Sequence, residues 1–189
     1  MTIAIDAEPL KLNDHVTISG GAADMLREHF GPVCTAIARA DGPRAFENPF
    51  SSTVVHEAGH AVLYATMGEE VTCLSVKRLL YGKHWGQWTG FTDGGPRLQT
   101  DETTDPKEDY KQACMIMAGV VSEIIYDKDN FRQASSMDEV MLAYLTGNNI
   151  SKKTSAPFEY VMTSILNFTF NALKANREVV LEIADLLRR

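Results

Sequence analysis

Residues 50–67 read FSSTVVHEAGHAVLYATM, and this stretch decides the fold. Its apolar residues recur at helical spacing and Gly68 follows as a natural stop, so the stretch predicts one helix. Residues four apart lie on the same helix face, which places His56 and His60 side by side. Two imidazole nitrogens at this spacing can bind one Zn²⁺ ion at about 2.0–2.1 Å. The stretch therefore predicts a helix that supplies two ligands of a zinc site.

The acid between the two histidines predicts catalysis. Glu57 is rotated by about 100° from His56 around the helix, so it can reach a water on the metal without being a ligand. Zinc lowers the pKa of that water to about 7, and a neighbouring carboxylate can take the proton. These are the groups that hydrolysis of a peptide bond requires. The competing interpretation is two ordinary histidines, one exposed and one in the core.

A catalytic zinc ion needs a third protein ligand and one open position for water. Four side chains further along the chain could supply that ligand: Glu123, His84, Asp138 and Glu139. Glu123 lies in an apolar helical stretch, where an unpaired carboxylate is costly. Asp138 lies at the start of the next predicted helix. From the residues alone Glu123 and Asp138 are the two best candidates, and spacing cannot choose between them.

The rest of the chain predicts a mainly α fold of the α+β class, with a small β-sheet or hairpin. Asp105-Pro106 followed by Glu108 is typical of a helix start. Predicted helices cover 21–40, 105–126 and 135–147, and a long helix or a helix pair is predicted at 155–189. A strand is predicted at 70–79 and a second strand or hairpin at 81–92, after a loose or strand-like arm at 1–20. We expect two regions, an N-terminal arm and helix at 1–44 and the main domain at 45–189.

Composition excludes several partners. The net charge is −7, from 18 basic and 25 acidic residues, and this balance argues against binding nucleic acid or an anionic membrane surface. The N-terminus lacks the pattern of a signal peptide. Three cysteines occur without a C-x-x-C pair, so a disulfide framework is not expected and the reducing cytoplasm is the simpler location.

Beyond the zinc-binding string, several segments resemble the peptidase domain of the FtsH-type ATP-dependent proteases. HEAGHA at 56–61 resembles their zinc-binding helix. The later segments follow in the same order as in that family: VTCLSVKR (71–78), GFT (90–92), MAGVVSEIIYD (117–127), QASSMDEV (133–140) and NALKANREVVLEIADLL (171–187). The resemblance covers about residues 50–189 and implies a helical, zincin-like peptidase domain.

The resemblance also implies residue roles. It makes Asp138 the third zinc ligand, although Ser135 and Asp138 can equally be read as a capping box that opens a helix. Glu123 then becomes a carboxylate that hydrogen-bonds a ligand histidine. Gly90, Phe91 and Thr92 fall on the strand that contacts substrate in the family.

The chain departs from the family in ways that bear on function. It contains no G-x-x-x-x-G-K-[ST] loop, and MAGVVSE lacks the arginine usual at that segment. We therefore expect a zinc metallopeptidase that cleaves unfolded or flexible polypeptides without an ATPase of its own. Its expected partners are a peptide substrate and either further copies of the chain or a separate ATPase. The alternative is a catalytically silent binding or regulatory module.

Overall fold

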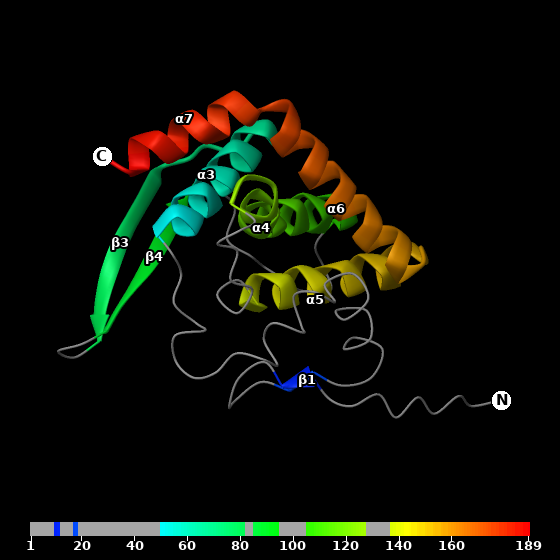
Figure 1. Cartoon of the computed structure of the whole chain (residues 1–189). Coiled ribbons are helices and arrows are strands. Elements are labelled where there is room, and N and C mark those ends of the chain that lie inside the picture. The colour runs from blue at the N-terminus through cyan, green and yellow to red at the C-terminus, as the bar shows by residue number, and fades with distance from the viewer. Residues whose placement is uncertain (1–9, 12–16, 19–49, 82–84, 95–104, 128–136) are drawn as a thin grey trace. The chain divides into compact units, whose positions relative to one another are not determined.

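The computed structural model describes residues 10–11, 17–18, 50–81, 85–94, 105–127 and 137–189 (Figure 1). Contacts divide the chain into two units, Met1–Glu47 with Arg132–Met137, and Asn48–Phe131 with Asp138–Arg189. The described elements of the first unit are β1 (Leu10–Lys11) and β2 (Thr17–Ile18), which pair antiparallel. The helix predicted at 21–40 lies outside the described residues.

The second unit is mainly helical with one small antiparallel sheet, as the sequence predicts. Its elements in chain order are α3 (Phe50–Thr66), β3 (Cys73–Tyr81), β4 (Trp85–Asp93), α4 (Pro106–Tyr126), α5 (Met137–Thr154), α6 (Phe158–Ala175) and α7 (Arg177–Leu187). None of the helices within the described ranges is long and apolar enough to cross a bilayer.

Helix α3 is the central element of this unit. It contacts α4, α6, α7 and both strands of the hairpin, and Figure 1 shows α7 running alongside it. Eleven of its 17 residues are buried. Its small and branched side chains, together with Glu57 and His60, face these neighbouring elements on nearly every side of the helix. The helix ends where predicted, and Gly68 follows with a φ of 78°, a conformation that glycine adopts without a steric cost.

Helix α4 begins and ends close to the predicted positions. Asp105 caps it by accepting a hydrogen bond from the Lys107 amide, and proline occupies the first turn. Every residue of 112–123 is buried, so α4 is surrounded by other parts of the protein. The buried Asp109 near its start pairs with Lys153 of α5 at 2.8 Å. Polar groups on this helix therefore need partners from its neighbours.

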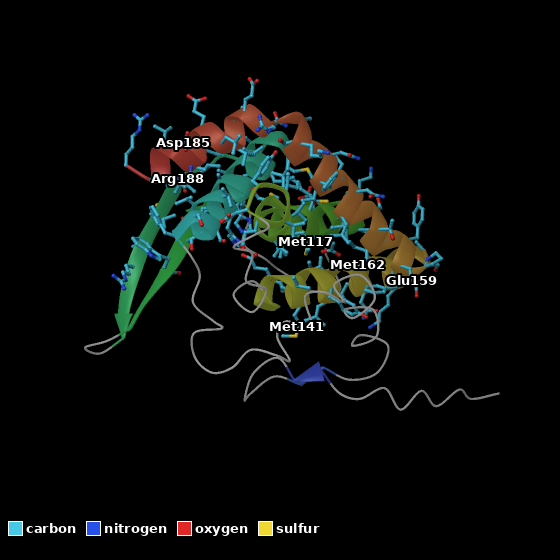
Figure 2. All side chains as sticks on the ribbon, in the orientation of Figure 1. Met117, Met141, Glu159, Met162, Asp185 and Arg188 are labelled. Atoms are coloured by element: carbon cyan, nitrogen blue, oxygen red, sulfur yellow. The ribbon has the colours of Figure 1, made fainter. Side chains whose placement is uncertain are left out.

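The C-terminal helices differ in part from the prediction. The sequence predicts that the third helix ends at Gly147, but α5 continues to Thr154. Gly147 therefore lies within the helix and does not end it. A side chain at this position would overlap the sulfur of Met162, a buried residue of α6 (Figure 2). The final region is a helix pair, α6 and α7, which meet at Asn176. Figure 2 also shows Asp185 near the end of α7 and Arg188 just after it, and these two residues form an ion pair.

The hairpin presents one face of β4 to α3. Its register pairs Thr92 with Leu74 and Gly90 with Val76. Because side chains alternate along a strand, Gly90 and Thr92 lie on the same face. The Thr92 hydroxyl donates a hydrogen bond to Glu57 of α3, so this face of β4 is the one that covers the zinc-motif helix. Trp88 packs on Phe50 with 4.3 Å between ring centroids, which agrees with a packing role for this tryptophan.

We predict that the stability of the second unit depends on α3. Leu63 is fully buried, and its replacement by alanine should lower the free energy of unfolding by about 2–5 kcal/mol, since it leaves a cavity. Leu186→Ala is the control, because this leucine of α7 is 57% exposed and should change the free energy by no more than about 0.5 kcal/mol. Chemical denaturation measures both. Equal losses would contradict the central position of α3.

Candidate metal centre

The two histidines of α3 turn their rings toward one another. Their ring centroids are 4.7 Å apart, and the two Nε2 atoms are separated by 3.0 Å. His60 is 8% exposed, and the side chain of His56 is 12% exposed. The helical spacing therefore does bring two imidazole nitrogens to one point, as the sequence predicts.

Hydrogen bonds on the far side of each ring fix which nitrogen carries the proton. Nδ1 of His60 lies 2.9 Å from the carbonyl oxygen of Met115, which can only accept, so Nδ1 must donate. Nδ1 of His56 lies 2.6 Å from Oε1 of Glu123 and donates to that carboxylate. In their neutral forms both rings therefore direct the lone pair of Nε2 toward the same point.

A third donor completes this group. Oε1 of Glu139, on α5, lies 3.1 Å from Nε2 of His56 and 3.1 Å from Nε2 of His60. Its second oxygen, Oε2, is buried and has no hydrogen-bond partner among the residues that the structure describes. Two lone pairs and a carboxylate converge here. This arrangement is favourable only when a cation, either a metal ion or a proton, lies between them.

The three donor atoms fit a zinc ion. His56, His60 and Glu139 each offer one ligand atom to the same point, and their separations are 3.0–3.1 Å. Ligands about 2.0–2.1 Å from a tetrahedral zinc ion lie about 3.3 Å apart, so small side-chain movements suffice. Two histidines and one carboxylate are also a donor set found in catalytic zinc sites, which keep the fourth position open.

The charges of the cluster shift the pKa values of its members. Burial lowers the pKa of His56, but the charge of Glu139 and the hydrogen bonds that the ring makes to Glu123 and Glu139 outweigh it and raise the pKa well above its usual value. The pKa of His60 is raised for the same reason, chiefly by Glu139. Burial raises the pKa of Glu139, but the two histidines lower it far below its usual range. The carboxylate therefore stays ionised and available to a cation.

Small residues on α3 and α4 make room for the cluster. A side chain at Gly119 would overlap the ring of His56, and one at Gly59 would meet Ser122 and the carbonyl of Ala118. The Ser122 hydroxyl donates to the carbonyl of Val55 at 2.7 Å, which ties the two helices together at this point. The close approach of α4 to α3 is what lets Glu123 reach His56.

The side chain of Glu57 extends from α3 to β4. Its Oε2 accepts a hydrogen bond of 2.5 Å from the Thr92 hydroxyl, and a side chain at Gly90 would overlap the Glu57 carboxylate. Glu57 is 5% exposed, yet it does not belong to the group of three donor atoms. It is therefore placed beside the cluster and held by the hairpin.

A pocket of about 250 Å³ opens onto these groups. Glu57, His60 and Glu139 supply its carboxylate and imidazole groups. The remaining lining comes from α3, β4, α4 and α5: Tyr64, Gly90, Phe91, Thr92, Met115, Ile116 and Leu142. The pocket therefore combines an apolar lining with three groups able to act on a bound molecule, and it includes all three strand residues predicted to contact substrate.

The predicted third ligand and the observed third donor are neighbours in sequence. The sequence analysis assigns that role to Asp138, whose side chain lies outside the described residues, so that assignment stays a prediction. The carboxylate that the structure brings to the histidines belongs to Glu139, a candidate that is not among the two best from the sequence. His84, another candidate, lies outside the described residues. Glu123 makes the predicted hydrogen bond to a histidine.

No protein-family model matches the chain, and no curated protein matches it.

We predict that Gly119 is required for metal binding more than for folding. In Gly119→Ala the new methyl group should displace the His56 ring and lower zinc affinity by at least about tenfold, a loss typical when the surroundings of a ligand change. Gly147→Ala is the matched control, because it is also a helical glycine but faces Met162. Zinc titration with a competing chelator measures both variants. Equal affinities would contradict the placement of His56.

Proposed function

We propose that this protein is a zinc-dependent metallopeptidase that hydrolyses peptide bonds in unfolded or flexible polypeptides. One observation carries the proposal: Glu57 lines the same pocket as His60 and Glu139, beside three converging donor atoms of which it is not one. A purely structural zinc site has no use for such an acid and prefers four protein ligands. The order of segments that resemble the FtsH-type peptidases supports the same activity.

His56, His60 and Glu139 are the residues that would hold the zinc ion. When bound, zinc would lower the pKa of a water molecule and polarise the carbonyl group of the substrate. Glu123 and the Met115 carbonyl orient the two imidazoles, because each accepts a hydrogen bond from the Nδ1–H group of one ring. Such partners keep Nε2 free as the ligand atom.

Glu57 performs the proton transfers. Its carboxylate takes a proton from water as the water oxygen bonds to the carbonyl carbon of the substrate. The carbon–nitrogen bond then breaks, and Glu57 passes the same proton to the leaving amine. The second proton of the water leaves the new carboxyl group and ends on the amine, so the products are a carboxylate and an ammonium group and one water molecule is consumed for each bond cleaved.

The pocket favours an extended, flexible substrate. Its apolar lining of Phe91, Met115, Ile116 and Leu142 suits an apolar side chain of a bound peptide. The pocket is too small for a folded domain, and the chain has no nucleotide-binding loop with which to unfold one. We therefore propose that substrates arrive unfolded, or that a separate ATPase delivers them.

The ligand set is tested by metal content. We predict that His60→Ala and Glu139→Gln each lose stoichiometric zinc, because a site with two ligands binds weakly, while Asp138→Asn keeps it. Inductively coupled plasma mass spectrometry on dialysed protein measures the ratio of zinc to chain. Loss of zinc in Asp138→Asn with retention in Glu139→Gln would instead make Asp138 the third ligand.

Activity is tested at Glu57. We predict that the wild-type protein cleaves fluorescein-labelled casein and that 1,10-phenanthroline stops the cleavage. Glu57→Gln should lower the rate by at least about a hundredfold, since the amide cannot accept the proton. The variant should keep its zinc. If zinc binds but casein stays intact in the wild type and in Glu57→Gln alike, the protein is a binding module and not a peptidase. If Glu57→Gln cleaves casein at the wild-type rate, Glu57 is not the general base.

A further inference from the structure

We propose that Thr92 of β4 is a positioning residue for the general base Glu57, and that its hydroxyl group sets the catalytic rate without contributing to zinc binding. The inference rests on the proposed peptidase function and adds to it a residue whose effect can be measured separately. Thr92 lies outside the zinc-binding string, 35 residues from Glu57 in the chain.

The contact itself is short and directed. The Thr92 hydroxyl lies 2.5 Å from Oε2 of Glu57 and 3.4 Å from the backbone carbonyl of the same residue. A hydroxyl has one proton to donate, and the 2.5 Å contact to a carboxylate is the stronger of the two. Within the described part of the chain, Thr92 is the side chain that donates to the Glu57 carboxylate.

The strand is built to bring the two groups together. Gly90 lies on the same face of β4 as Thr92, and any side chain at this position would overlap Glu57. The carboxylate therefore rests on the backbone at Gly90 while the Thr92 hydroxyl holds Oε2. The hydrogen bond from Thr92 engages Oε2 alone, so it constrains Glu57 without occupying both of its carboxylate oxygens.

Constraint of this kind affects rate more than binding. A glutamate side chain has several rotamers, and a general base works only in those that reach the reacting water. Loss of the hydroxyl should lower the fraction of molecules with Glu57 in a productive position. None of the three zinc donors contacts Thr92 through a hydrogen bond in the described residues, so zinc affinity should not change.

The test compares three variants with matched volumes and positions. Thr92→Val removes the hydroxyl at nearly constant shape, Thr92→Ser restores it, and Thr89→Val makes the same change on the opposite face of β4. With labelled casein, kcat of Thr92→Val should fall about 10- to 100-fold at similar KM, as expected for a lost hydrogen bond to a charged group. Thr92→Ser and Thr89→Val should stay within about threefold of wild type.

Zinc content and thermal unfolding separate positioning from stability. Assays run well below the Tm of every variant, and kcat is expressed per bound zinc. Thr92→Ala serves as a second variant without the hydroxyl if Thr92→Val does not fold. A wild type that cleaves casein together with a fully active Thr92→Val or Thr92→Ala variant overturns the role of Thr92 only. A zinc-loaded wild type that cleaves nothing overturns the peptidase function and this inference together.

Discussion

The structure of the site depends on two imidazole lone pairs that face each other at 3.0 Å. Each ring is committed to this orientation by a hydrogen bond on its far side, to Glu123 in one case and to the Met115 carbonyl in the other. Facing lone pairs repel unless a cation lies between them, and the Glu139 carboxylate adds negative charge at the same point. The fold therefore prepares a place for positive charge.

The packing of α3 on α4 holds the His56 ring in this orientation. Glu123 is 2% exposed, and a buried carboxylate of this kind is stable only with partners such as the His56 ring. It reaches that ring because Gly59 and Gly119 allow the helices to approach closely. The same helix pair thus serves as the core of the domain and as the support of the candidate metal centre. Stability and the geometry of the candidate site therefore depend on shared residues.

Much of this could be predicted from sequence because the signals were local. The helical spacing of residues 50–67 and the capping pattern at Asp105 gave the ends of α3 and α4, since both depend on neighbouring residues. The end of α5 was predicted wrongly at Gly147. Glycine there reflects contact with Met162 of α6, a tertiary cause that a local stop signal cannot reveal.

In the candidate site, too, some features depend on neighbouring residues in sequence and others depend on tertiary packing. The pair His56 and His60 follows from one helical turn, whereas the third donor depends on how α5 is rotated about its axis. Adjacent acids point about 100° apart on a helix, so the order Asp138-Glu139 in the sequence cannot say which one faces the histidines. Gly119 did carry a signal, a small residue within a continuous apolar run, which is typical of close packing between helices.

X-ray absorption at the zinc K-edge tests the central claim most directly. For the wild-type protein loaded with one equivalent of zinc, we predict a first shell of nitrogen and oxygen atoms at about 2.0–2.1 Å, with the multiple-scattering pattern of two imidazoles. A shell with a sulfur atom at about 2.3 Å, or with fewer than two imidazoles, would contradict it.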